Sequence, residues 1–117
     1  MTNSDLVTAA GKLADRVYFT FTPDPRKNPQ AAPIVERFRA AKIEPEGYVL
    51  YAYAALQLFE QAVTQAGGVE RTKLEPVLRK GKFDTAIGTI EFDEKGDLKK
   101  PAFAIYKWTG GRYDYAE

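Results

Sequence analysis

The pattern of hydrophobic residues predicts a short helix and then a strand at the start of the chain. Asn3 or Ser4 can cap a helix that runs to Ala10, where Gly11 ends it. Residues 17–21 (VYFTF) form a nearly continuous β-branched and aromatic run. Such a run is typical of a strand buried on both faces, so we expect helices to surround it.

A loop and an amphipathic helix are expected next. Three prolines interrupt residues 22–29 and prevent regular structure there. Asn28 and Pro29 then form an N-cap and N1 pair, which favours a helix start. Apolar residues recur at helical spacing as far as Lys42, so one face of this helix is expected to pack inward.

The most periodic stretch of the chain runs from Tyr48 to Ala66, where apolar residues recur every three or four positions. Gly67 and Gly68 follow it and predict the end of a long helix. We also expect a shorter helix over residues 72–80, just before Gly81. Its first turn has the spacing of a capping box, Thr72 to Glu75, and its Pro76 fits only if it lies in that first turn.

The last third changes to an alternating period, which predicts strands. Residues 89–92 form the first, followed by an acidic turn at 93–97. Residues 103–108 and 112–115 form two more, joined at Gly110-Gly111 as a hairpin. The order of helix, strand, three helices and three strands indicates an α/β or α+β fold, and these strands do not complete a sheet.

Composition excludes several classes of function. The 117 residues match one ordinary domain, and 17 basic against 16 acidic residues give a net charge of +1. That balance provides no field to attract nucleic acid or an anionic membrane. The first residues have neither the basic nor the apolar region of a signal peptide, and no apolar run is long enough to span a membrane. The sequence therefore predicts a chain that stays where it is made.

Catalytic and metal-binding patterns are missing. The chain has no histidine and no cysteine, and its one serine, Ser4, lies near the terminus. The one enzymatic alternative that remains is a small hydrolase that uses a pair of carboxylates. In the acidic turn, Lys95 takes a position that a calcium loop needs for an oxygen ligand. We expect no metal, nucleotide or other cofactor.

Three tyrosines, Tyr48, Tyr51 and Tyr53, begin the long helix. A tyrosine ring is flat and apolar with a polar tip, which suits the wall of a ligand cavity. The alternative is that the rings fill the interior, and this alternative is favoured for Tyr51 and Tyr53. Trp108 is expected in the core or on a sheet surface rather than at a ligand.

Several segments together resemble one protein family. The stretch from Glu44 to Leu56 (EPEGYVLYAYAAL), the FDT of residues 83–85 and the FDEKGDL of residues 92–98 are similar to the C-terminal part of leucine/isoleucine/valine-binding proteins of ABC importers. These are type I periplasmic solute-binding proteins. The apolar strand and Pro-Asp-Pro loop of residues 17–29 also fit the family.

The resemblance implies a partial α/β fold, incomplete as a monomer, with helices packed on a mixed sheet and a C-terminal antiparallel hairpin. Within the single segment 1–117, residues 1–22 would come from the second lobe and 23–100 mainly from the first. Residues 101–117 would form a crossover and return strands. The family closes two lobes over one amino acid, and this chain matches only about the last third, as a fragment would.

The resemblance also implies the ligand and the partners. A branched-chain or other small amino acid and the membrane permease of an ABC importer are expected for the full-length protein, in the periplasm. Only Tyr48 maps onto a position that lines the ligand pocket, whereas the groups that grip the ligand carboxylate and ammonium lie outside this chain. We therefore expect weak or no ligand binding by the chain alone. The alternative is an interaction domain that self-associates through its bare apolar surfaces.

Overall fold

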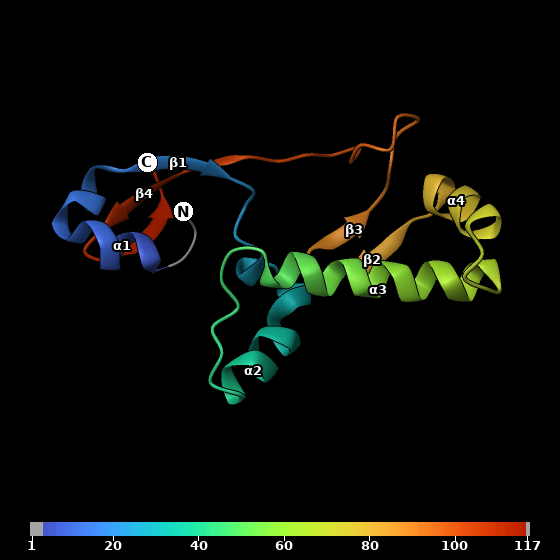
Figure 1. The fold of residues 1–117 in the computed structure, drawn as a ribbon, viewed down its shortest axis with the longest axis horizontal. Coiled ribbons are helices and arrows are strands. Elements are labelled where there is room, and N and C mark those ends of the chain that lie inside the picture. The colour runs from blue at the N-terminus through green and yellow to red at the C-terminus, as the bar shows by residue number, and fades with distance from the viewer. Residues whose placement is uncertain (1–3, 117) are drawn as a thin grey trace. The chain divides into compact units, whose positions relative to one another are not determined.

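The computed structural model describes residues 4–116, which fold as two compact units (Figure 1). The first unit contains the chain up to Asp24 and again from Ala102. The second unit contains the intervening segment, Pro25–Pro101. The chain therefore leaves the first unit once and returns to it once.

The first unit is a three-stranded antiparallel sheet with helical turns on one face. It contains α1 (Asp5–Ala10), the 3₁₀ helix η1 (Gly11–Arg16), β1 (Tyr18–Phe21), β4 (Ala104–Thr109) and β5 (Arg112–Tyr115), in the strand order β1-β4-β5. The predicted strand and C-terminal hairpin are confirmed. Gly11 ends α1 at a φ of 53°, and Ser4 occupies the N-cap without a capping hydrogen bond from its side chain. The alternative cap, Asn3, lies outside the described residues.

The prediction that β1 is buried on both faces is wrong. Phe19 is buried, but the neighbouring Tyr18 is 58% exposed. The reason is that β1 pairs only with β4 among the described strands, and the residues that pack against it come from α1, η1 and the other strands on one face. The core on that face contains Ala14, Phe19, Tyr106 and Trp108, which places Trp108 in the interior.

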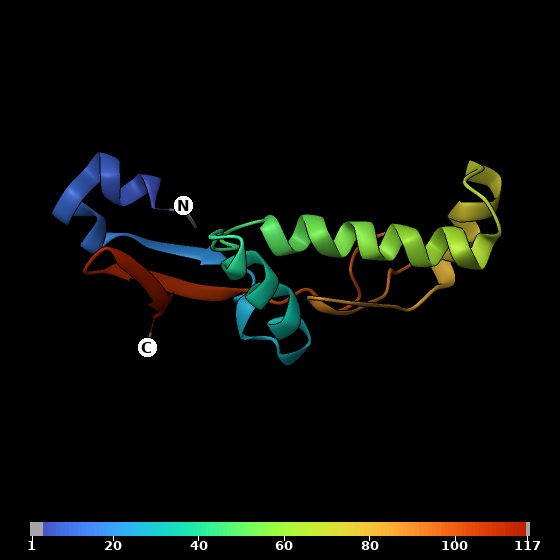
Figure 2. The same cartoon turned by 90° about the horizontal axis from the view of Figure 1, so that it is seen from below.

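The second unit is mainly helical. It contains the 3₁₀ helices η2 (Pro25–Lys27) and η3 (Pro29–Ala31), the helices α2 (Ala32–Ala40), α3 (Val49–Ala66) and α4 (Arg71–Lys80), and the short hairpin strands β2 (Phe83–Thr85) and β3 (Gly88–Ile90). In both views the hairpin runs beside α3, and α4 folds back at the end of α3 (Figures 1 and 2). The pair β2–β3 is antiparallel, like every pair in the first unit, so the mixed sheet that we expected is not seen in residues 4–116.

The proline-rich loop is more ordered than its prolines suggest. Asn28 caps a helix as predicted, since its Oδ1 accepts a hydrogen bond from the backbone N–H of Gln30 at 3.0 Å. The helix it caps is η3, and α2 begins only at Ala32. The predicted end at Lys42 is also too late, because α2 ends at Ala40 and Lys42 has a φ of 61°.

The long helix is confirmed, whereas the start of α4 differs from the prediction. Gly67 ends α3 in the left-handed conformation, with a φ of 66°. Helix α4 begins at Arg71 after an N-cap at Glu70, so Thr72 lies inside the helix and no capping box forms. Pro76 lies in the helix interior. Leu74 in the same helix packs into the core with Ala62 and Phe83.

The strand β2 was not predicted. It is three residues long, and the charged Asp84 separates Phe83 from Thr85, so it shows no extended apolar pattern. Its position is fixed by Phe83, which is fully buried with Ala62 and Leu74. The next strand, β3, ends at Ile90, and Phe92 instead forms an isolated bridge with Leu98 across the acidic turn.

Candidate functional site

The candidate ligand residue Tyr48 stands at the junction between a loop and the long helix. Tyr48 is the N-cap residue of α3. Just before it, Gly47 adopts a φ of 58°, a left-handed conformation that glycine reaches without steric cost. Pro45 is fully buried and anchors the loop to the second unit. The buried proline and the glycine turn together fix the point from which the Tyr48 ring projects.

A carboxylate held by two arginines anchors the same loop. Glu44 Oε2 accepts a hydrogen bond from Arg39 Nε at 2.8 Å, and Glu44 Oε1 accepts one from Arg26 Nη1 at 2.9 Å. Arg39 is at the end of α2, and Arg26 is in η2. The hydrogen bond from Arg39 is the largest of the effects that hold the pKa of Glu44 below its usual value. The sequence pattern marked Glu44 only as part of the segment before Tyr48, and it did not link Glu44 to Arg26 or Arg39, because these residues are separated along the chain.

The three tyrosines differ in their surroundings. The Tyr48 side chain is 71% exposed, and its ring meets that of Tyr51 edge-on at 6.2 Å. Tyr53 is half-buried and meets Phe38 edge-on at 6.3 Å, beside the core of Ala31, Val35 and Leu50. Tyr53 is therefore packed against Phe38 at the edge of this core, and its predicted interior position is met only in part. Tyr48 is the one of the three that presents an open aromatic surface, and its assignment to a ligand pocket stays a prediction.

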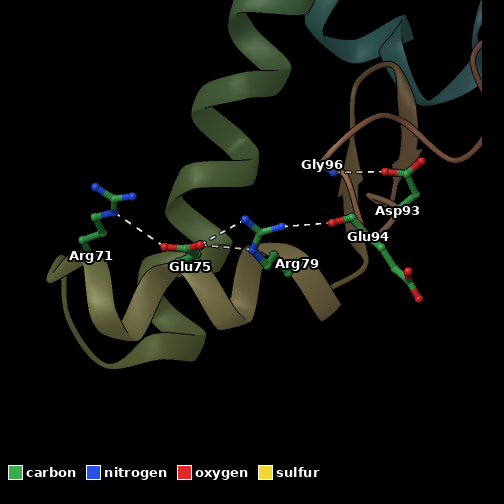
Figure 3. Close-up of polar contacts among 6 residues, drawn as sticks. All are labelled: Arg71, Glu75, Arg79, Asp93, Glu94 and Gly96. Carbon is green, nitrogen blue, oxygen red and sulfur yellow. Dashed lines mark hydrogen bonds and ion pairs between the residues drawn. The ribbon is translucent and has the colours of Figure 1, made fainter.

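A second surface feature is a groove beside α4. It has a volume of about 630 Å³, and its lining includes Leu58, Leu74, Leu78 and Phe92. Arg71 and Arg79 both contact the Glu75 carboxylate along its rim, at 3.5 and 3.1 Å (Figure 3). The hydrogen bond from Arg79 is the main reason why the pKa of Glu75 is lowered.

A hydrogen bond at the rim of this groove joins α4 to the acidic turn of residues 93–97. Arg79 Nη1 donates to the carbonyl oxygen of Glu94 at 3.3 Å (Figure 3). Within the turn, Asp93 Oδ1 accepts hydrogen bonds from the backbone N–H groups of Lys95, Gly96 and Asp97 at 2.9 to 3.0 Å. The turn is therefore organised by its own aspartate. No cluster of three metal-ligating side chains occurs in residues 4–116.

The sequence of this chain matches a known protein family. A family model described as periplasmic binding protein matches residues 1–112. The chain belongs to the periplasmic binding protein family. Proteins of this family act outside the cytoplasm, and no helix in the described part of this member is long and apolar enough to cross a membrane.

Curated relatives of this periplasmic binding protein are named for amino acids. The chain is 40% identical over 119 aligned residues to Leu/Ile/Val-binding protein homolog 1 of Brucella suis. The alignment covers 98% of this chain and 32% of the relative. The chain thus spans about a third of the length of the curated relatives that it matches.

Solved structures show the same fold. A leucine binding protein from Thermotoga maritima superimposes with a TM-score of 0.82 at 26% identity, over 99% of this chain and 34% of that one. An ABC transporter substrate-binding protein from Desulfitobacterium hafniense, solved with Leu, gives a TM-score of 0.72 at 22% identity, over 90% of this chain and 32% of that one. This member of the family therefore has part of a type I periplasmic-binding-protein fold. The division of its residues between two lobes stays a prediction.

Proposed function

We propose that these residues form the C-terminal part of a periplasmic protein that binds a branched-chain or similar small amino acid for an ABC importer. The observation that carries the proposal is the 40% identity to a Leu/Ile/Val-binding protein homolog across 98% of the chain. The permease of that importer is the proposed protein partner. In this role, the exposed ring of Tyr48 supplies apolar contact to the aliphatic side chain of the ligand.

The chain alone is proposed to bind amino acids weakly or not at all. An amino acid is a zwitterion, and burying its two charges requires partners for both. The segment around Tyr48 supplies an aromatic surface, whereas the nearby Glu44 carboxylate is already paired with Arg26 and Arg39. Calorimetric titration of the 117-residue chain with leucine, isoleucine and valine should give no heat of specific binding. A micromolar dissociation constant would contradict this part of the proposal.

A chimera tests the ligand class. The matching third of the Brucella suis relative is replaced by residues 1–117, and the product is titrated with the same three amino acids beside the unmodified relative. We expect the chimera to bind at least one of them and Tyr48→Ala to weaken that binding tenfold or more. Tyr18→Ala, which removes an exposed tyrosine of the first unit, is the matched control. A folded chimera that binds none of the three would contradict the proposed ligand class.

One observation favours a second candidate, self-association of the chain. Helix α3 exposes Leu56 and Phe59, and Leu56 is 70% exposed. The neighbouring Ala52 and Ala55 are exposed too, and these small side chains allow a second backbone to approach. Light scattering after size-exclusion chromatography should show a dimer that Leu56→Glu converts to a monomer, while Gln65→Glu on the same helix has no effect. A monomer at all concentrations would rule out this candidate.

A further inference from the structure

The chain crosses between its two units at two peptide bonds. The first crossing lies between Asp24 and Pro25, and the second lies between Pro101 and Ala102. Strand β1 ends at Phe21, so residues 22–24 lie beyond the end of the β1–β4 register.

Two tyrosine hydroxyls hold this segment. Tyr106 Oη donates a hydrogen bond to the carbonyl oxygen of Thr22 at 2.9 Å. Tyr115 Oη accepts a hydrogen bond from the backbone N–H of Asp24 at 3.0 Å. The two hydrogen bonds hold the backbone on either side of Pro23, which itself has no N–H to donate. Both tyrosines come from the far end of the sequence, more than 80 residues along.

The sheet places both hydroxyls. Phe19, Tyr106 and Tyr115 are partners in register across β1, β4 and β5, so their rings form one row. Phe19 stacks on Tyr106 with 5.2 Å between ring centroids and 12° between planes, and Tyr106 lies 4.9 Å from Tyr115. Tyr106 is buried, whereas Tyr115 is 40% exposed. Because Tyr106 is buried and stacked between the rings of Phe19 and Tyr115, its hydroxyl is held in place.

We propose that Tyr106 and Tyr115 form a latch that makes residues 22–24 a rigid extension of the first unit. The latch holds the backbone of this connection up to the Asp24–Pro25 bond, where η2 begins. Tyr115 is the half of the latch that opens, because water can reach its ring and replace its hydrogen bond. Tyr115 is thus a positioning residue, and this role does not depend on which ligand the protein binds.

The exchange rate of the Asp24 amide tests the latch. In the ¹⁵N-labelled 117-residue chain, Tyr115→Phe keeps the ring and removes only the hydroxyl that accepts from Asp24. Amide exchange at Asp24 should become at least tenfold faster. Exchange at Trp108, whose N–H bonds to Val17 inside the sheet, should stay the same. Tyr18→Phe, on the exposed part of the same sheet, is the control and should change neither rate.

Two results would overturn the proposal. An unchanged Asp24 rate in Tyr115→Phe would show that the hydroxyl does not hold the segment. An equal acceleration at Asp24 and Trp108 would show that the substitution loosens the whole unit rather than releasing residues 22–24. A second variant, Tyr106→Phe, should accelerate exchange in the same segment by removing the bond to Thr22. If that variant fails to fold, Tyr115→Phe still decides the question.

Discussion

The side-chain amide of Gln61 satisfies both backbone groups of Asp84. Gln61 Oε1 accepts a hydrogen bond from the Asp84 N–H at 3.2 Å, and Gln61 Nε2 donates one to the Asp84 carbonyl at 2.9 Å. One turn earlier on α3, Gln57 Oε1 accepts from the N–H of Ala86 at 2.8 Å. Within residues 4–116, β2 pairs with β3 alone, so these side-chain amides take the place of a neighbouring strand at its other edge.

Removing the Gln61 amide should therefore destabilise the second unit. Gln61→Leu leaves both Asp84 groups without their side-chain partner, at a cost of about 1–2 kcal/mol, because Asp84 is exposed and water compensates in part. Urea unfolding followed by circular dichroism measures this cost, and Gln65→Leu on the same helix is the control. Equal unfolding midpoints for the two variants would contradict the prediction.

The pairing of Glu44 with Arg26 and Arg39, which we call the Glu44 clamp, should make the stability of the loop before Tyr48 sensitive to acid. The pKa of Glu44 is lowered from 4.5, first by the hydrogen bond from Arg39 and further by Arg26. A carboxylate with a depressed pKa in the folded state stabilises the fold above its unfolded value and loses that contribution as the pH falls through its folded pKa. Glu44→Gln should thus cost at most about 1 kcal/mol at pH 7, since the site is near the surface, and less at pH 3, where protonation of Glu44 removes part of the contribution.

The comparison with Glu46→Gln isolates this effect. Glu46 is in the same loop, and the described residues show no contact between its side chain and Arg26 or Arg39. Urea midpoints of both variants and the parent chain are measured at pH 7 and at pH 3. A Glu44→Gln penalty of the same size at both pH values would show that the clamp does not depend on the charge of Glu44.

The long periodic helix was predictable from the sequence, whereas the short strand β2 was not. The apolar repeat from Tyr48 to Ala66 located α3 within one residue at each end, because an 18-residue helix repeats the apolar spacing over several turns. The strand β2 gave no signal, because its three residues depend on Phe83 packing and on the amides of α3.

The exposed face of β1 shows a different limit. Its composition predicts a strand with two buried faces, and Tyr18 is exposed because, among the described strands, β1 pairs with β4 alone. For the candidate site, the pattern identified the tyrosines and the loop before them. It favoured an interior position for Tyr53 and not for Tyr48, but it could not name Phe38, on another helix, as the residue that Tyr53 contacts.

Alkaline conditions should selectively destabilise the first unit. Burial, followed by the hydrogen bond and charge of Tyr115, raises the pKa of Tyr106 far above its ordinary value of 10. A raised pKa in the folded state gives stability that is complete below pH 10 and is lost as the pH rises further, by at most about 1.4 kcal/mol per pH unit. Trp108, the one tryptophan, is buried beside Tyr106 and reports unfolding of this unit by fluorescence.

The matched variant is Tyr106→Phe. It should be less stable than the parent at pH 8, because the hydrogen bond to Thr22 is lost, and its stability should fall less steeply between pH 10 and 11. Equal slopes for the two chains would show that Tyr106 ionises as readily in the folded state as in the unfolded state.

Gly81 is required for close packing rather than for backbone freedom. Its φ of −75° suits any residue, but a Cβ there would lie 2.6 Å from the carbonyl oxygen of Val77 and closer still to the Phe83 ring. The Gly81 N–H also bonds to that carbonyl at 2.7 Å, so the two backbones cannot separate freely. Gly81→Ala should therefore cost about 1–3 kcal/mol by overpacking.

Gly96→Ala is the informative comparison for Gly81→Ala. Gly96 has open space around its Cα but a φ of 95°, so its substitution strains the backbone of an exposed turn without disturbing the core. Urea unfolding should rank Gly81→Ala among the core variants, with a shifted Phe83 ring resonance in the NMR spectrum. In Gly96→Ala the ring resonance should stay in place while amides of the turn shift. An unperturbed Phe83 resonance in Gly81→Ala would contradict the packing explanation, since the ring is among the first atoms that the new methyl group meets.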